Sequence, residues 1–242
     1  MENTTYGICK LSAIALRKEP RHSSEMVSQL LYNEIYMVLD SLQEWVLVQT
    51  GFFRYQGWIQ AKQFCEIGEN ELYALKNGSL FLINKAIAEI DGQILSLGTP
   101  LFTPHPDATE VPSSFHPELL VENAQKLLNA PYLWGGRTAF GIDCSGMVQV
   151  CAHLSGLLLP RDASQQMECG ELVYFLPETQ PGDLAFFGED CGPITHVGIL
   201  MGDEQIIHAS GQVRIDFLDQ TGIFNKERNE HTHLLQAIKR LK

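Results

Sequence analysis

The segment FGIDCSGMVQV, residues 140–150, places Cys144 between an acidic residue and a Ser-Gly pair, directly ahead of an apolar run. Apolar residues in that run recur at helical spacing as far as Gly156, a natural helix stop. Cys144 is therefore expected in the first turn of a helix, where unpaired backbone N–H groups favour the thiolate and lower the pKa of the thiol. The alternative is a packed, inert cysteine, the role expected for most of the six cysteines, which form no CxxC pair.

Two histidines are candidates for a base that would serve this sulfur. His196 in ITHVGILMG and His208 in QIIHASG flank a predicted hairpin whose turn contains Gly202 and Asp203. Because a short loop is centred midway between the two histidines, we expect them on neighbouring strands, directly opposite or within one residue, and on one face that points toward Cys144. The alternative is a pair of structural histidines on a half-exposed face. Five further histidines are expected to be solvated surface residues in linkers, turns or the charged tail, at positions 22, 105, 116, 231 and 233.

A thiolate, an imidazole and a second polar group that orients the imidazole make up the logic of a catalytic triad with cysteine as nucleophile. Cys144, His196 and His208 supply these three groups. The same side chains are also a possible three-ligand zinc set with an open position, although the absence of an HExxH motif weakens that alternative. We expect no metal and no other cofactor.

The elements that must position these residues divide the chain into three stretches. Residues 1–66 alternate apolar and polar residues in short runs, typical of a small antiparallel β barrel or sandwich. Residues 67–116 continue from about residue 70 as strand-like pieces and end in a linker rich in Pro and Ser. Residues 117–242 begin with a helix at Pro117 and a second helix after Asp143, and strands dominate from about residue 183, which predicts an α+β domain.

Charge and composition exclude several classes of partner. The chain has 242 residues, 17 basic and 29 acidic side chains and a formal net charge of −12, without a basic stripe. Nucleic acid and anionic membrane surfaces are therefore not expected partners. No segment has the apolar length of a bilayer span and the N-terminus does not resemble a secretory signal, so we expect a cytoplasmic protein. The oligomeric state has no indication in the sequence.

Several motifs occur in an order that resembles a known family. They are YLWGG at 132–136, DCSG at 143–146, LPRDAS at 159–164, PGDLAFF at 181–187, HVG at 196–198 and HAS at 208–210. Together they resemble the NlpC-type cysteine peptidases of bacterial cell-wall metabolism, over residues 117–242. The resemblance implies a papain-like catalytic domain, with helices packed on an antiparallel sheet. Upstream, RKEPRHSSEMVSQLLYNE and YQGWI are similar to bacterial SH3-like domains, with residues 67–116 as a possible degenerate second copy.

The resemblance implies hydrolysis of murein peptides between the γ-carboxyl of D-glutamate and a diamino acid, either diaminopimelate or lysine. Cys144 would be the nucleophile, His196 the general base and then acid, and His208 the orienting residue. Tyr132 would polarise the oxyanion together with the backbone N–H of Cys144; the alternative for Tyr132 is a core aromatic. The neighbouring Trp134 is expected to be a packing residue.

Relatives with an SH3-like domain tend to require the free amine of an N-terminal L-alanine in the substrate. The positions that correspond are Asp143, Glu34 and Tyr55, with Ser145, Ser164 and Arg161 as candidates for binding the α-carboxylate of the glutamate. Each has a plainer alternative: Asp143 is also a natural helix N-cap, Glu34 a solvated turn charge and Arg161 an exposed charge.

Location and specificity together predict an enzyme that trims released peptides, L-Ala-γ-D-Glu-diamino acid and longer, in murein peptide recycling. The other functional classes are the zinc-dependent hydrolase described above and a non-catalytic wall-peptide binding module with a decayed site.

Overall fold

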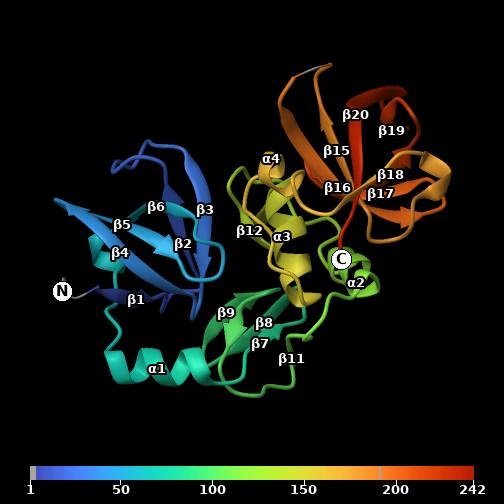
Figure 1. Cartoon of the computed structure of the whole chain (residues 1–242). Coiled ribbons are helices and arrows are strands. Elements are labelled where there is room, and N and C mark those ends of the chain that lie inside the picture. The colour runs from blue at the N-terminus through green and yellow to red at the C-terminus, as the bar shows by residue number, and fades with distance from the viewer. Residues whose placement is uncertain (1–3, 191) are drawn as a thin grey trace. The chain divides into compact units, whose positions relative to one another are not determined.

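The computed structural model describes residues 4–190 and 192–242, so the predicted domain start at residue 1 and Cys191 lie outside the described residues. The chain forms two compact units (Figure 1). The first contains the residues up to Val111 together with Trp134–Ala139, and the second contains Pro112–Leu133 and Phe140–Lys242. The domain limits that the sequence predicts, at residues 66 and 116, remain predictions.

A six-stranded antiparallel sheet forms the N-terminal part of the first unit, with the strand order β1-β4-β5-β6-β2-β3. Its strands are β1 (Tyr6–Ile8), β2 (Ala13–Arg17), β3 (Met26–Leu31), β4 (Ile35–Leu42), β5 (Trp45–Thr50) and β6 (Gln56–Gln60). The alternation that predicted strands here reflects burial of every second residue in β2 and β5, because successive side chains point to opposite faces. The inner face is an apolar core that includes Ile14, Leu30, Tyr36, Val48 and Ile59.

The rest of the first unit contains a helix that the sequence analysis did not predict. After the 3-10 turn η1 (Ala61–Gln63), helix α1 covers Glu69–Asn77, where strand-like structure was expected. No residue of α1 is buried, so the helix lacks the periodic apolar face by which a helix is usually recognised, while Glu69 and Glu71 favour its first turn. The predicted β structure then follows as β7 (Phe81–Ile83), β8 (Ile87–Ile90), β9 (Gln93–Ser96), β10 (Pro100–Leu101) and β11 (Ala108–Glu110).

Residues Trp134–Ala139 belong structurally to the first unit, although the chain on either side belongs to the second. Gly135 has φ +77°, and a Cβ there would meet the carbonyl oxygen of Met26 at 2.3 Å, so only glycine fits. The predicted packing of Trp134 is wrong, because the residue is 58% exposed and its Nε1 donates to Glu25 Oε1 at 2.8 Å. The short strand β12, Arg137–Thr138, completes this segment.

The second unit begins with the two helices that the sequence predicted. Helix α2 covers Pro117–Gln125 with Pro117 in its first turn, and helix α3 covers Cys144–Leu154 after the N-cap Asp143. Both helices pack against strands β16 (Ile194–Gly202) and β17 (Gln205–Ser210). The shorter α4 (Ala163–Gln166) and the 3-10 turn η2 (Leu176–Glu178) follow them in the chain.

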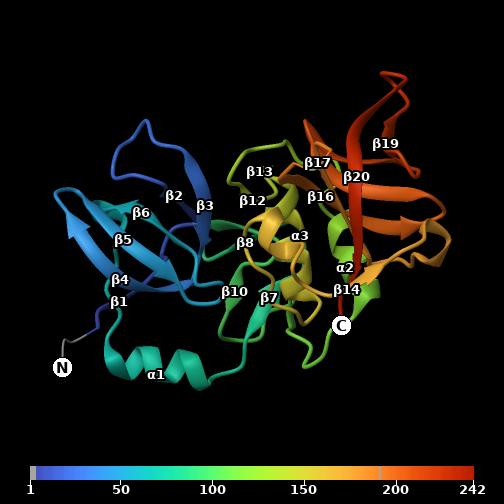
Figure 2. The same ribbon diagram turned by 45° about the horizontal axis from the view of Figure 1, so that its top comes forward.

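A seven-stranded antiparallel sheet makes up most of the second unit, with the order β14-β20-β15-β16-β17-β18-β19. The strands besides β16 and β17 are β13 (Gly141–Ile142), which lies outside this sheet, and β14 (Glu171–Val173), β15 (Leu184–Gly188), β18 (Gln212–Leu218), β19 (Gly222–Asn225) and β20 (Glu230–Arg240). Strand β20 also pairs with β19, so the sheet curves and closes on itself (Figure 2). The predicted helices on an antiparallel sheet are confirmed only in part, because few helices cover a largely β unit.

None of the helices in the described residues combines the length and the apolar character that crossing a membrane requires.

Candidate active site

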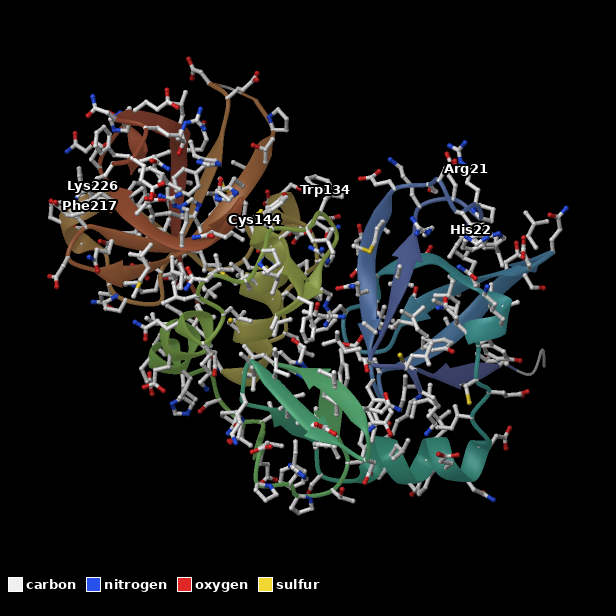
Figure 3. The ribbon with its side chains drawn as sticks, turned by 180° about the vertical axis from the view of Figure 1, so that it is seen from behind. Arg21, His22, Trp134, Cys144, Phe217 and Lys226 are labelled. Atoms are coloured by element: carbon white, nitrogen blue, oxygen red, sulfur yellow. The ribbon has the colours of Figure 1, made fainter. Side chains whose placement is uncertain are left out.

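Cys144 is the first residue of α3 and is 5% exposed. Its side chain lies between α3 and the sheet of the second unit (Figure 3). The N-cap Asp143 accepts a hydrogen bond from the backbone N–H of Gly146 at 2.7 Å, which starts the helix at the cysteine. Backbone N–H groups of Ser145 and of Val197 on β16 face the sulfur. The thiol is therefore held at the strand that also carries His196.

The predicted lowering of the Cys144 pKa is wrong. Burial raises the pKa of the thiol to about 11, and the adjacent Asp143 carboxylate raises it further, against the smaller lowering by the backbone N–H groups and by Arg161. Burial disfavours the charged thiolate, and at Cys144 this effect outweighs the stabilisation that a helix N-terminus gives. The resting sulfur is consequently a thiol, and a base must remove its proton when it reacts.

The two predicted histidines come from adjacent antiparallel strands, but their register differs from the expected one. His208 on β17 lies opposite Gly198, not opposite His196. The paired residues centre the turn on residue 203, one residue later than expected, and this moves the partner of His208 by two residues. A shift of two residues keeps both side chains on one face, whereas a shift of one would have separated them. His196 Nε2 and His208 Nδ1 lie 2.9 Å apart.

Asp216 extends this pair of rings into a row. Its Oδ2 atom lies 3.0 Å from His208 Nε2. Arg214 donates through Nε to Asp216 Oδ2 at 2.6 Å and through Nη2 to Oδ1 at 3.0 Å. Burial alone would raise the pKa of the Asp216 carboxyl, but the hydrogen bonds from His208 and Arg214 lower it, so the carboxylate stays charged.

The sequence analysis missed Asp216 although a signal was present. The run VRIDFL follows the HASG segment after a one-residue turn at Gly211, which has φ +72°. In the resulting hairpin His208 pairs with Arg214, so Asp216 is the diagonal neighbour of His208 on the same face. Extending the strand pairing by one more hairpin would have placed Asp216 beside the histidines.

His233 is a second residue that the sequence analysis misplaced. It was expected to be solvated, yet it is half-buried on β20 and stacks on His196, with ring centroids 4.2 Å apart and an interplanar angle of 28°. Burial first, and the neighbouring His208 second, lower the pKa of His233 to about 4. The pKa of His196 is lowered well below its ordinary value by burial and by both other rings. These imidazoles are neutral at pH 7.

Tyr132 lies close enough to Cys144 for their charges to interact. Its phenol is partly buried, and burial, followed by the charges of Cys144 and Asp143, raises its pKa to about 12. A backbone bridge between Tyr132 and Ile142, just before Cys144, holds this segment beside the start of α3. The hydroxyl is therefore protonated at neutral pH and is available as a hydrogen-bond donor.

Three predicted substrate-binding residues gather next to Cys144, all buried. Arg161 contacts the Asp143 carboxylate with both terminal nitrogens, at 3.0 Å and 2.6 Å, and its Nη1 also donates to Ser145 Oγ at 2.9 Å. Gln166, which the sequence analysis did not single out, donates to the Ser145 carbonyl at 3.0 Å. The alternative of an exposed Arg161 is wrong, since its side chain is 2% exposed. Asp143 is both the expected N-cap and the partner of Arg161.

The other predicted substrate-binding residues lie elsewhere. Ser164 is exposed on α4 in the second unit. Tyr55 and Glu34 belong to the first unit. Glu34 is buried, accepts from Arg137 at 2.9 Å and 3.0 Å and accepts from the backbone N–H of Leu31 at 3.1 Å, so its alternative as a solvated turn charge is wrong. The substrate-binding roles assigned to these residues stay predictions.

One group among the described residues has the arrangement of a metal-ligand set, and it consists of His196, His208 and His233. One nitrogen of each ring lies within 4.8 Å of one nitrogen of each of the others. Cys144 is not a member of this group. The set therefore differs from the Cys144, His196 and His208 ligands of the zinc alternative suggested by the sequence.

Comparison with known proteins adds two family matches. A model of the NlpC/P60 family matches residues 129–231, and a model described as a bacterial dipeptidyl-peptidase Sh3 domain matches residues 16–64. Among curated proteins, the gamma-D-glutamyl-L-lysine dipeptidyl-peptidase of Bacillus subtilis is 38% identical over 38% of this chain and 31% of its own length. Dipeptidyl-peptidase 6 of Lysinibacillus sphaericus is 27% identical over 85% of this chain and 89% of its own length. The chain thus matches about a third of the first of these relatives.

Solved structures show the same fold. An NlpC/P60 family protein from Bacillus cereus superposes with a TM-score of 0.80 at 21% identity, covering 97% of this chain and 99% of that protein. An NlpC/P60 endopeptidase from Photobacterium damselae subsp. piscicida gives a TM-score of 0.69 at 17% identity, over 96% of this chain and 70% of that protein.

Proposed function

We propose that this chain, which carries an NlpC/P60 domain preceded by a bacterial dipeptidyl-peptidase SH3 domain, is a cysteine peptidase that cleaves the bond between the γ-carboxyl of D-glutamate and a diamino acid in murein peptides. The observation that carries the proposal is the row from Asp216 through His208 to His196, next to the strand position that holds Cys144. The name of the Bacillus subtilis relative, a gamma-D-glutamyl-L-lysine dipeptidyl-peptidase, supports the choice of bond.

The row fixes which nitrogen of each ring carries a proton. The charged Asp216 keeps the proton of His208 on Nε2, so His208 Nδ1 is an acceptor. His196 must then donate from Nε2 across the 2.9 Å contact. The remaining nitrogen of His196, Nδ1, is left unprotonated in the neutral ring and is the base for the thiol.

With these protonation states the reaction proceeds through a thioester. His196 Nδ1 takes the thiol proton of Cys144 as the sulfur attacks the γ-carbonyl carbon, and the imidazolium returns this proton to the amine of the departing diamino acid. Water then gives a proton to the same nitrogen and attacks the thioester. Collapse of that intermediate breaks the C–S bond, releases the γ-carboxyl and restores the thiol.

The oxyanion of each tetrahedral intermediate requires donors in place before the reaction. The backbone N–H of Cys144, at the first turn of α3, is one donor that no intrahelical partner needs. The protonated Tyr132 hydroxyl is the second. Two such donors, in a site with little water, stabilise the developing charge by several kcal/mol.

The charged cluster beside the nucleophile is proposed to hold the rest of the D-glutamate. Arg161 and Ser145, together with the exposed Ser164, bind its α-carboxylate, and Asp143 receives the free amine of L-alanine. The amine-binding roles that the family resemblance implies for Glu34 and Tyr55 of the first unit stay part of the proposal. Arg161 also neutralises Asp143, which limits the rise in the Cys144 pKa. The cytoplasmic location and the recycling role expected from the sequence are parts of this proposal.

Purified protein incubated with L-Ala-γ-D-Glu-diaminopimelate, with the lysine analogue and with intact sacculi tests the function. We expect release of the diamino acid from one or both tripeptides and little from sacculi, as measured by chromatography of the products. The tripeptides with an acetylated L-alanine amine are the matched control and should react at least tenfold more slowly. Release from sacculi alone would contradict the recycling role, and no release from any substrate would contradict the peptidase.

A further inference from the structure

We propose that His196, His208 and His233 form a binding site for a divalent transition-metal ion, best suited to Zn²⁺, and that occupancy of this site switches the peptidase off. The metal-binding part stands on the geometry of the three rings. The inhibitory part rests on the proposed function.

The three rings present imidazole nitrogens at spacings close to those of a zinc site. His196 Nε2 and His208 Nδ1 lie 2.9 Å apart, and all three candidate ligand atoms fall within 4.8 Å. Two nitrogens bound to one tetrahedral Zn²⁺ at about 2.0–2.1 Å lie roughly 3.3 Å apart, so small side-chain rotations are sufficient. Imidazole is a preferred ligand of Zn²⁺, Cu²⁺ and Ni²⁺.

Two of the rings already have the outer partners that metal-bound histidines use. His208 faces Asp216 with its other nitrogen at 3.0 Å, which is the carboxylate–histidine arrangement found behind zinc ligands. His233 Nδ1 lies 2.9 Å from Thr232 Oγ1. These contacts orient the rings and leave His208 Nδ1 and His233 Nε2 as the ligand atoms in our assignment.

A polar cavity provides the entry path. Its volume is about 420 Å³, and it is lined by residues that include His208, Asp216, Thr232 and His233. The cavity belongs wholly to the second unit and opens onto two of the three rings.

Coordination removes the base through a change of tautomer. The active row requires the proton of His196 on Nε2, with Nδ1 free for the thiol. An ion bound to Nε2 takes that lone pair, and the ring's single proton moves to Nδ1. His196 then has no acceptor for the Cys144 proton, and the 2.9 Å contact to His208 is lost as well.

The experiment measures Zn²⁺ affinity by competition with a chromophoric chelator, using protein stripped with EDTA, for the parent, Cys144→Ala and His233→Phe. His233→Phe keeps a ring stacked on His196 but removes one ligand. We expect Cys144→Ala to retain the parental affinity within about threefold, and His233→Phe to lose at least about 100-fold, more than the 10- to 100-fold that loss of an outer partner costs.

Loss of affinity in Cys144→Ala would assign the ion to the thiol and overturn the tri-histidine site, as would parental affinity in His233→Phe. Zn²⁺ at saturation should reduce tripeptide hydrolysis by the parent at least tenfold, and EDTA should restore it. Full activity with bound Zn²⁺ would overturn the inhibition. Because affinity is also measured on the inactive Cys144→Ala, failure of the peptidase proposal leaves the metal site separately tested.

Discussion

Among the residues that the structure describes, each unit holds one fully buried arginine paired with a carboxylate, and the two pairs have different surroundings. In the first unit Arg137 and Glu34 are 2% and 3% exposed, and their further hydrogen bonds end on the backbone of β3, at Gln29 and Leu31. In the second unit Arg161 and Asp143 are 2% and 8% exposed, and they share their bonds with Ser145 and with the start of α3. Buried charge alone therefore does not distinguish the two pairs; what distinguishes the second is its neighbour Cys144, the proposed nucleophile.

The strongest way to test the contrast is to remove the sulfur. Cys144→Ala should lower kcat/KM for the tripeptide by about 10⁴-fold or more, because the nucleophile is lost. Cys151→Ala is the matched control, as Cys151 is fully buried on the same helix and alanine keeps the backbone carbonyl that accepts from Ser155 Oγ. The Cys151→Ala variant should lower the free energy of unfolding and leave kcat/KM per folded molecule within about threefold of the parent value. Equal losses in both variants would mean that α3 packing, not the thiol, is responsible.

Breaking the Arg137–Glu34 ion pair of the first unit tests whether this pair has only a structural role. Glu34→Gln leaves the Arg137 charge buried without its counter-charge and should lower the free energy of unfolding by about 3–5 kcal/mol, measured by urea denaturation. KM for the tripeptide should change less than threefold if the carboxylate only holds Arg137. An unchanged stability with a KM raised tenfold would instead favour the substrate-binding role that the sequence predicted for Glu34.

Asp216→Asn tests the imidazole row of the second unit. An amide can donate to His208 as well as accept from it, so the tautomers of His208 and His196 are no longer fixed. We expect kcat to fall by about 10- to 100-fold with little change in KM, and the pH dependence of kcat to shift. Thermal unfolding of the same sample separates this effect from loss of structure. A fall in stability that accounts for the whole loss of kcat would contradict a positioning role.

The smallest expected effect concerns the pH dependence of stability. The pKa of His233 is about 4 in the folded protein, against 6.5 in the unfolded chain, so the unfolded chain binds more protons between these values. The free energy of unfolding should fall as the pH decreases from about 6.5 toward 4, and His196 acts in the same direction. His233→Phe should show a shallower decrease between urea midpoints at pH 7 and pH 4.5. An identical slope would contradict burial of a neutral His233.

Much of the site could be predicted from the sequence. The relations that define it either join residues close together in the chain or depend only on whether the offset between two paired strands is even or odd. The Asp-Cys pair at the start of an apolar helical run predicts the position of Cys144 in α3. The even spacing of His196 and His208 predicts one shared face, which survives the two-residue error in register. These relations do not require knowledge of the distant parts of the chain.

What the sequence did not predict depends on burial by elements far apart in the chain. The pKa of Cys144 is set mainly by burial under β16, and local helix position alone gave the wrong direction. His233 lies in a polar tail sequence, yet β20 pairs with β15 and brings it onto His196. Helix α1 has no buried face and so leaves no periodic pattern.

The hairpin of β17 and β18 encodes both His208 and Asp216 within one short stretch, around a tip at Gly211. Related chains can therefore tolerate insertions and deletions at this tip only when the register between β17 and β18 keeps both side chains on the same face. A single-residue insertion absorbed by slippage would turn the carboxylate to the outer surface, while a longer loop beyond the last pair would leave it in place. Length variation at this one tip is therefore a second route, beside substitution of Asp216, by which a related chain would lose the carboxylate that faces His208.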